Sequence, residues 1–309
     1  MSSASHSPHM SDSSLGNSVR LRDGRALAYL EVGAGDGIPV IHCHGNPSSR
    51  LEVLLLAEQA TNLNVRLIAV DRPGIGYSDP KPGYGLLDWP DDVAEVADQL
   101  GLDRFAVSGL SGGGPFALAC AYKIPERLTA CGLISTVAPV AFMKQAGPGG
   151  LRAVYWLLER MPPALFRAFV RRTLSQGASA SEANMEKTLT QNSAGLGSGD
   201  QQAIADPRIR QIYARTAVES YRQGKPGLEA NVEEARLLAT QWAFHVEDIS
   251  FERILLWHGE QDRIMPVGAA RRLAQALPHS AATYYPDAGH LSTAVTYAPD
   301  ILQALRSTA

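Results

Sequence analysis

The chain has 309 residues, a length that suits one catalytic core carrying an insertion. Hydrophobic residues make up 45% and charged residues 19%, a composition that excludes global disorder. With 28 Lys and Arg residues against 31 Asp and Glu residues, the net charge is -3, so no broad basic field favours nucleic acid or anionic lipid.

The cysteine content and the lack of long apolar runs indicate the compartment. An odd number of cysteines cannot form a complete disulfide set, and each one lies inside an apolar run. No apolar run reaches the roughly 18 residues needed to cross a bilayer, and the N-terminus lacks an apolar signal core. We therefore expect a cytoplasmic protein, monomeric or homodimeric, that does not insert into membranes.

Residues 1 to 17 are rich in serine and nearly devoid of large apolar side chains. Such a segment cannot offset the entropy of ordering, so we expect a flexible tail. The two histidines in it, His6 and His9, are excluded from function for the same reason.

From residue 18 onward, short apolar runs bounded by Gly, Asp or Pro predict strands. They alternate with helical spacing at 91 to 100 and 115 to 122, and this alternation predicts a mostly parallel sheet with helices on both faces. The predicted strands of this half are residues 19–21, 26–32, 39–43, 66–70, 105–110 and 129–134.

After residue 139 the pattern is helical almost throughout, until about residue 247. Strands return at 253–257 and 282–285, with helices at 266–277 and 296–305. We therefore expect a core of about eight strands formed by residues 18–139 and 248–309, with a helical cap, residues 140–247, inserted after strand six. The predicted cap helices are residues 151–160, 165–174, 181–191, 208–221 and 227–244.

The most informative motif follows the strand run that starts at residue 105. Residues 109 to 113 read Gly-Leu-Ser-Gly-Gly, a GxSxG pattern placed between a strand and a helix. On such a tight turn the serine hydroxyl is exposed at the helix N-terminus, and the flanking glycines allow close approach of the backbone. Ser111 is therefore the candidate nucleophile; the alternative is a glycine-rich turn without function.

A serine hydroxyl needs a base and a group that orients the base. Asp262 follows the strand run at 253–257, and His290 follows the last predicted strand, so the chain order is Ser, Asp, His. We assign His290 as the general base and Asp262 as the orienting carboxylate. Glu260 and Asp287 are the competing carboxylates, and Asp287 is expected to shape the turn before the histidine.

Donors for an oxyanion are predicted on the loop at residues 44 to 47, which reads His-Gly-Asn-Pro. The backbone N–H groups of Asn46 and Gly112 would form the oxyanion hole, with the Asn46 side chain lining the pocket. His42 and His44 are expected to brace this loop.

Taken together, five segments resemble motifs of the α/β-hydrolase superfamily, and the resemblance covers about residues 18 to 309. They are HGNP at 44–47, DRPGIGYS at 71–78, GLSGG at 109–113, HGEQD at 258–262 and DAGH at 287–290. The sequence is similar to the capped subgroup of esterases, lactonases, dehalogenases and epoxide hydrolases. Because the last two use an aspartate nucleophile, Ser111 favours a serine esterase or lactonase.

The resemblance implies a serine hydrolase that needs no metal and no organic cofactor. It would cleave an ester-like bond, a carboxylic ester, lactone or thioester, of a small to medium and largely apolar substrate through an acyl-enzyme on Ser111. Other reactions share this fold and triad, so a cofactor-free lyase or cyclase and a non-catalytic ligand receptor stay open. Candidate substrate contacts are Asn46, Trp156 from the aromatic residues of the predicted cap, and Leu291 beside the base.

Overall fold

The computed structural model describes residues 16–146, 153, 156–157 and 160–307. Most of the predicted tail and most of the helix expected at 151–160 lie outside these residues. Asn17, which we had placed in the tail, is the first residue of a strand and pairs with Tyr29. The first strand therefore includes a residue that the composition of the N-terminus had assigned to the tail.

The centre of the molecule is an eight-stranded sheet in the order β1-β2-β4-β3-β5-β6-β7-β8. β1, β2 and β4 pair antiparallel, whereas every neighbouring pair from β4 through β8 is parallel. The predicted fold class is thus confirmed. The strands are β1 (Asn17–Arg20), β2 (Ala26–Gly33), β3 (Ile38–Cys43), β4 (Val65–Val70), β5 (Phe105–Leu110), β6 (Leu128–Ile134), β7 (Ile254–Gly259) and β8 (Ser280–Tyr285).

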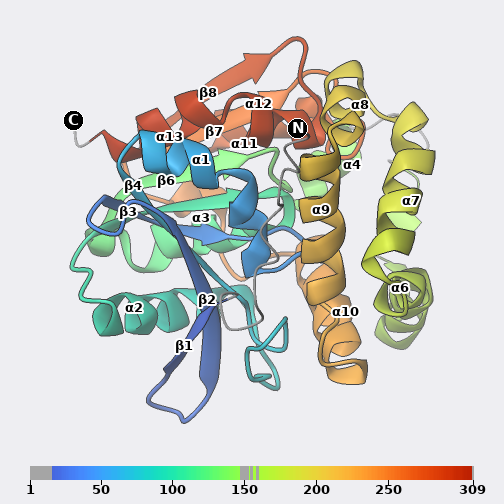
Figure 1. The fold of residues 1–309 in the computed structure, drawn as a ribbon, viewed down its shortest axis with the longest axis horizontal. Helices are drawn as coiled ribbons and strands as arrows, with labels where there is room; N and C mark the ends of the chain where they lie inside the picture. The colour runs from blue at the N-terminus through green and yellow to red at the C-terminus, as the bar shows by residue number, and fades with distance from the viewer. Residues whose placement is uncertain (1–15, 147–152, 154–155, 158–159, 308–309) are drawn as a thin grey trace, which may run out of the picture.

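Helices cover both faces of the sheet, and each face has its own apolar core (Figure 1). α2 (Trp89–Gln99), α3 (Gly114–Lys123) and α11 (Val267–Ala276) pack on one face. α1 (Ala57–Asn62) and α13 (Ala298–Arg306) pack on the other, next to the 3-10 helix η2 (Arg50–Leu55). Burial of each large apolar side chain contributes about 1.5 to 3 kcal/mol, so the central strands are held from both sides.

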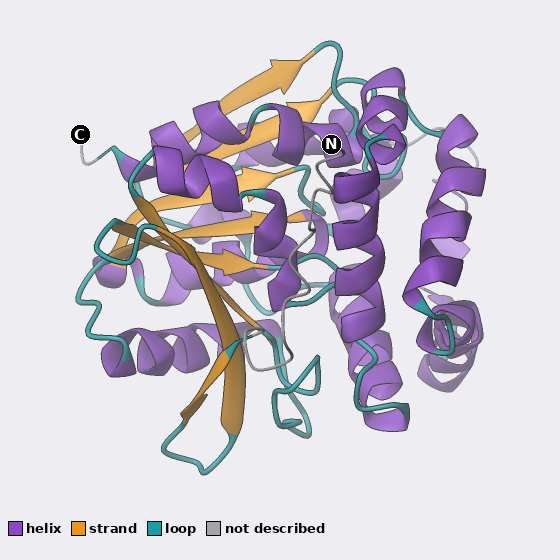
Figure 2. Cartoon of the chain, viewed as in Figure 1, coloured by secondary structure: helices purple, strands orange, loops and turns teal. Residues whose placement is uncertain are grey.

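Between β6 and β7 the chain forms an insertion made of helices, which lies beside the sheet (Figure 1). In Figure 2 the arrowheads of the central strands point towards this insertion, so the strand ends that carry functional loops in α/β folds face it. Its described helices are α4 (Val140–Ala146), α6 (Pro163–Ala178), α7 (Glu182–Asn192), α8 (Ser198–Ala205), α9 (Pro207–Glu219) and α10 (Lys225–Ala239).

Several helices differ from the sequence prediction. α10 ends at Ala239 rather than near residue 244, because Thr240 is extended and Trp242 and Phe244 pack as a ring pair in the core. α1, α4 and α8 were not predicted. Nor was α12 (His290–Thr296), a short helix that precedes α13.

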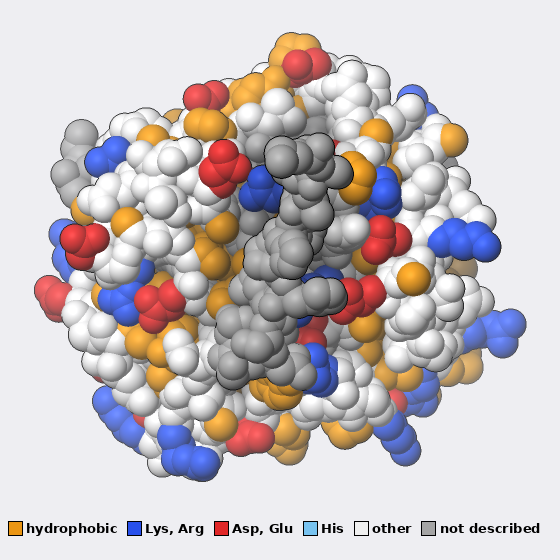
Figure 3. Space-filling view, in the orientation of Figure 1, with side chains coloured by type: hydrophobic (Ala, Val, Ile, Leu, Met, Phe, Trp, Pro, Cys, Tyr) orange, Lys and Arg blue, Asp and Glu red, His pale blue; other side chains and the backbone are white. Residues whose placement is uncertain are grey.

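Across the described part of the chain, no helix is both long enough and apolar enough to cross a membrane. Figure 3 shows that basic and acidic side chains are interspersed among the described residues of one face. That face therefore matches the near-balanced charge of the sequence.

Candidate active site

Ser111 lies at the turn between β5 and α3, in a backbone conformation that residues other than glycine rarely adopt. Its φ is +53°, in the left-handed region, and Ser111–Gly113 form a 3-10 turn. A turn of this kind ends the strand abruptly and presents the hydroxyl at the start of the next helix. The strained turn expected from the GxSxG pattern is therefore present.

The glycines on either side of Ser111 are required by backbone packing. A Cβ on Gly109 would lie 2.3 Å from the carbonyl oxygen of Gly113. A Cβ on Gly113 would lie 1.9 Å from the carbonyl oxygen of Cys43 at the end of β3. Both distances are far below van der Waals contact, so β3, β5 and the turn can approach this closely only with glycine at both positions.

His290 and Asp262 form a direct hydrogen bond. Asp262 lies on the loop after β7, and His290 is the first residue of α12; His290 Nδ1 donates to Asp262 Oδ2 at 2.8 Å. The other oxygen, Asp262 Oδ1, accepts from the backbone N–H groups of Ile264 and Met265 at 2.8 and 2.7 Å. The imidazole is thus held in the tautomer that leaves Nε2 free to accept a proton.

The pKa values of this pair shift in opposite directions. Burial alone would lower the pKa of His290, but the charge of Asp262 and the hydrogen bond to it raise the pKa above its ordinary 6.5. Burial alone would raise the pKa of Asp262, but the charge of His290 and the shared hydrogen bond lower it below its ordinary 3.8. Asp262 therefore remains a carboxylate and favours a protonated imidazole.

The loops that carry these residues all lie at the carboxyl ends of the parallel strands. β5, β6, β7 and β8 are parallel neighbours, so the segments after β5, β7 and β8 lie at the same end. The loop after β3 joins them, since a Cβ on Gly45 would lie 3.7 Å from the Ser111 Cβ.

Asn46 and Gly112, the two residues predicted to form the oxyanion hole, lie close together in space. A Cβ on Gly112 would lie 3.3 Å from the backbone nitrogen of Asn46. The Asn46 side chain points elsewhere, because its Nδ2 donates to Glu234 Oε2 at 2.9 Å and to Asn231 Oδ1 at 3.3 Å. This arrangement leaves the backbone N–H groups of Asn46 and Gly112 as the candidate donors.

The family model for the alpha/beta hydrolase fold matches residues 38–294, which include all the loops described above. The chain is an α/β hydrolase.

Several known hydrolases are similar to this chain. The 2-hydroxymuconate semialdehyde hydrolase of Pseudomonas putida is 29% identical over 259 residues, 83% of this hydrolase and 82% of the relative. The 2-hydroxy-6-oxo-2,4-heptadienoate hydrolase of P. putida is 26% identical over 269 residues, 84% of each chain. The structure of an esterase from Exiguobacterium antarcticum has a TM-score of 0.69 at 20% identity, covering 95% of this chain and 100% of that one.

In this hydrolase, buried polar side chains brace the loop after β3, which carries one of the candidate oxyanion donors. His42 Nε2 contacts Glu52 Oε2 at 2.9 Å, and Glu52 accepts from the backbone N–H of Gly45 at 3.1 Å. Burial and the nearby Arg72 charge hold the pKa of His44 well below 6.5, so His44 is neutral and donates Nδ1–H to the Gly45 carbonyl at 2.8 Å. The bracing role expected for His42 and His44 agrees with these contacts.

Arg72 links the same loop to the insertion. It is fully buried, donates to the carbonyls of His44 and Gly45 at 2.6 and 2.9 Å, and forms two hydrogen bonds with Glu234 on α10 at 2.6 and 2.9 Å. Its guanidinium also lies 4.4 Å from the ring centre of Phe116. The sequence suggested only loop pairing for Arg72, since a partner 162 residues away leaves no local signal.

The competing carboxylates are occupied by other partners. Glu260 pairs with Arg271, and Asp287 accepts a hydrogen bond from the Tyr297 hydroxyl. These contacts leave Asp262 as the carboxylate bonded to the His290 ring.

Trp156 and Leu291, two of the predicted substrate contacts, lie in different environments. Trp156 is 53% exposed, and the Arg160 guanidinium lies 4.3 Å from its ring centre. Leu291 is partly buried, and its backbone N–H donates to Asp200 at 2.9 Å.

The sequence did not indicate two groups that lie beside the His290–Asp262 pair. The first is His258, buried at the end of β7, whose Nε2 lies 3.3 Å from Asp262 Oδ2 and 2.9 Å from the Met265 carbonyl. Burial lowers the pKa of His258 despite the Asp262 charge, so the ring is neutral. The second is Asp200 of α8, which contacts the His290 backbone. Its only sequence signal is one more aspartate in a helical segment.

Proposed function

We propose that the protein is a serine hydrolase that cleaves ester-like bonds through an acyl-enzyme on Ser111. The observation that carries the proposal is the 2.8 Å hydrogen bond between His290 and Asp262, on loops that open at the same sheet edge as the strained Ser111 turn. The resemblance to solved esterases supports the fold that this chemistry uses.

The proposed reaction has two steps. Ser111 Oγ attacks the substrate carbonyl carbon while His290 Nε2 accepts the serine proton, and the backbone N–H groups of Asn46 and Gly112 stabilise the oxyanion. The intermediate collapses to the acyl-enzyme, and His290 returns the proton to the departing alcohol. Water then attacks the acyl-enzyme by the same route, which releases the acid and restores the serine.

The charges around the site favour an uncharged substrate. Three carboxylates accept hydrogen bonds from residues of the candidate site or its loops: Glu52 from Gly45, Glu234 from the Asn46 side chain and Asp200 from the His290 backbone. The positive charge of Arg72 is offset by its pair with Glu234. The heptadienoate named for one relative is a carboxylate, so we expect this hydrolase to prefer neutral esters over such acids.

The first test is reaction of the protein with a fluorophosphonate and with short p-nitrophenyl esters. We expect the probe to label Ser111, and Ser111→Ala to lose at least about 1,000-fold in ester turnover because the nucleophile is gone. Peptide mass spectrometry locates the label. Ser175→Ala, at an exposed serine of α6, is the matched control and should keep full activity.

An unlabelled Ser111 in folded protein, or full ester turnover by Ser111→Ala, would overturn the proposal. Survival of a carbon-carbon or elimination activity in Ser111→Ala would favour the lyase or cyclase alternative. Tight ligand binding without turnover of any acyl substrate would favour a receptor.

The second test compares p-nitrophenyl butyrate with mono-p-nitrophenyl succinate, which has similar size and an added carboxylate. We expect kcat/KM to be at least about tenfold lower for the anionic ester, because like charges repel at a partly desolvated site. The alkaline hydrolysis rate of each ester corrects for intrinsic reactivity. Equal or greater turnover of the anionic ester would show that the site tolerates a carboxylate.

A further inference from the structure

Asp200 is a fully buried carboxylate that the proposed reaction does not use directly. It comes from α8 in the insertion, yet its hydrogen bonds go to the first turn of α12, where His290 lies. Asp200 Oδ2 accepts from the His290 backbone N–H at 2.8 Å. Asp200 Oδ1 accepts from the backbone N–H groups of Leu291 and Ser292, each at 2.9 Å, and from Ser292 Oγ at 2.8 Å.

These contacts cap the first N–H groups of α12 from outside the helix, in addition to the local bond from the Gly289 N–H to Ser292 Oγ. The residue before α12 is Gly289, which has no side chain to accept from the first N–H groups of the helix. A carboxylate at this position is stabilised by the free N–H groups and the positive end of the helix dipole. The start of α12, and with it the His290 backbone, is therefore fixed by a residue about 90 positions earlier in the chain.

Packing around Asp200 leaves little freedom. A Cβ on Gly289 would lie 2.4 Å from the Asp200 carboxylate, and a Cβ on Gly199 would lie 2.8 Å from Ser292 Oγ. The carboxylate is thus enclosed on the side of the histidine loop, and a movement of α8 would alter its contact with the His290 N–H.

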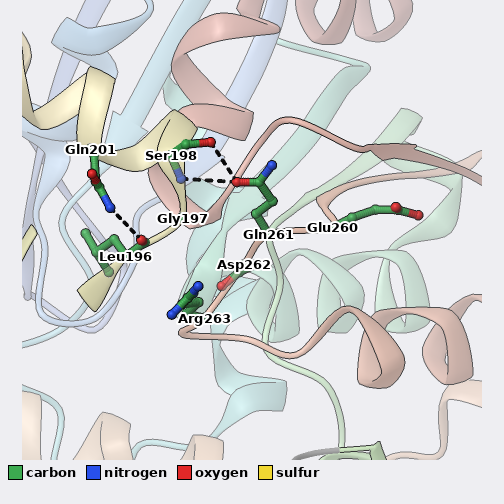
Figure 4. A pocket seen from close by; sticks show the side chains of 8 residues that line it. All are labelled: Leu196, Gly197, Ser198, Gln201, Glu260, Gln261, Asp262 and Arg263. Carbon is green, nitrogen blue, oxygen red and sulfur yellow. Dashed lines mark hydrogen bonds between the residues drawn. The ribbon is translucent and has the colours of Figure 1, made fainter. Parts of the chain in front are cut away.

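The same helix also contacts the loop of the orienting carboxylate. The backbone N–H and hydroxyl of Ser198 both donate to Gln261 Oε1, at 3.1 and 2.9 Å. Figure 4 shows these two side chains facing each other at the edge of a pocket, with Asp262 next along the chain. Gln261 Nε2 donates in turn to the Pro286 carbonyl at 3.0 Å, which ties together the loops after β7 and β8.

We propose that Asp200 is a positioning residue, supplied by the helical insertion, that fixes His290 for proton transfer to and from Ser111. The inference rests on the proposed serine hydrolase function and adds to it a group outside the Ser, Asp, His set. Asp200 acts through the backbone of His290 and does not touch the substrate.

Asp200 also contributes to the charge around the imidazole. The charged and titratable groups that face His290 are Asp262 and His258 from the β7 side, Asp200 from α8 and Glu52 from η2. The three carboxylates raise the pKa of His290, with Asp262 the largest contributor among them. Since His290 must be neutral to act as a base, loss of the Asp200 charge would move the acid limb of the pH profile to lower pH.

The test is Asp200→Asn, measured by the rate of fluorophosphonate labelling of Ser111 and by kcat and KM for a p-nitrophenyl ester across pH. The Asn amide oxygen can still accept from Leu291 and Ser292. The amide NH2, however, replaces the oxygen that accepted from the His290 N–H, so two donors face each other and that hydrogen bond is lost. We expect labelling and kcat to fall about tenfold to 100-fold, KM to change little, and the acid limb to move to lower pH.

The matched control is Asp206→Asn, which alters the N-cap of the neighbouring helix α9, a helix without a predicted catalytic residue. It should leave the labelling rate and the acid limb unchanged even if the melting temperature falls. If Asp200→Asn does not fold, Ser292→Ala removes the hydroxyl contact to Asp200, together with the acceptor of the Gly289 N–H, and should slow labelling about threefold to tenfold.

The outcomes separate this inference from the proposed function. A wild-type protein that is not labelled at Ser111 would overturn the proposed function. A labelled wild type together with wild-type rates and an unchanged acid limb in Asp200→Asn, or an unchanged labelling rate in Ser292→Ala, would overturn the positioning role alone.

Discussion

At the scale of single residues, His290 is held by contacts to both its ring and its backbone. The ring bonds to Asp262, and the backbone N–H bonds to Asp200. Both partners are carboxylates that raise the pKa of the imidazole, against the lowering effect of burial. In the proposed reaction, the pKa and the orientation of the proton-exchanging residue are therefore set by neighbours that do not themselves react.

This environment predicts the pH dependence of the reaction. The base must be neutral in the free enzyme, so kcat/KM should rise as pH increases through the pKa of His290, and the midpoint should lie above 6.5. Asp262→Asn should lower that midpoint and reduce kcat by up to about 10,000-fold, because the carboxylate that raises the pKa of His290 and fixes its tautomer is gone. The measurement is a kcat/KM profile for a neutral ester; a wild-type midpoint below 6.5 would contradict the prediction.

The sequence indicated Ser111, Asp262 and His290 because each follows a strand on a short loop with a recognisable local pattern. It could not indicate Asp200 or Glu234. Their roles depend on contacts that span 90 and 188 residues, and neither residue type nor spacing near them is unusual. The residues proposed to react have local sequence signals, whereas those that support them are recognised only in the folded structure.

At the scale of elements, α10 of the insertion and the loops after β3 and β4 are joined through a buried charge pair. Arg72 is inaccessible to solvent and donates to two backbone carbonyls, so its charge depends on Glu234 for compensation. Glu234 also holds the Asn46 side chain. One helix of the insertion thus secures the loop that carries the candidate oxyanion donor.

Removing this carboxylate should be costly. Glu234→Gln leaves the Arg72 charge buried without compensation and should lower the free energy of unfolding by about 3 to 5 kcal/mol. Glu229→Gln, on the same helix, breaks an exposed pair with Arg171 and should cost far less, because solvent screens that pair. Urea unfolding of both variants tests the difference, and equal losses would show that burial does not set the strength of these pairs.

The elements that the sequence predicted well are those with strong periodic or apolar signals. The central strands were expected within one to two residues, because both sheet faces are covered and their sequences are continuously apolar. α12 was missed because its seven residues include Thr and Val, which are weak helix formers, and because its cap comes from Asp200. α8 was missed because it has only eight residues and begins with Ser-Gly-Asp.

At the scale of the whole molecule, one of the two apolar cores, the one beneath α2, α3 and α11, encloses every cysteine. Cys43, Cys120 and Cys131 are inaccessible to solvent, and burial raises the pKa of Cys43 to about 11 despite the hydrogen bond from Trp89. The folded protein should therefore react with none of its thiols within minutes of mixing with Ellman's reagent, and should show three in concentrated guanidinium chloride. One rapidly reacting thiol in the native protein would reveal local opening of the core around it.

The junction between α8 and α12 also sets a rule for recombining this enzyme with others. A chimaera that took the whole segment between β6 and β7 from another hydrolase would gain a different substrate-facing surface, but it would also lose Asp200. We expect such hybrids to fold around an intact sheet and yet turn over slowly, unless the donor segment supplies a carboxylate to the same N–H groups. Residues 197–200 should accordingly be inherited with the sheet rather than with the insertion that contains them.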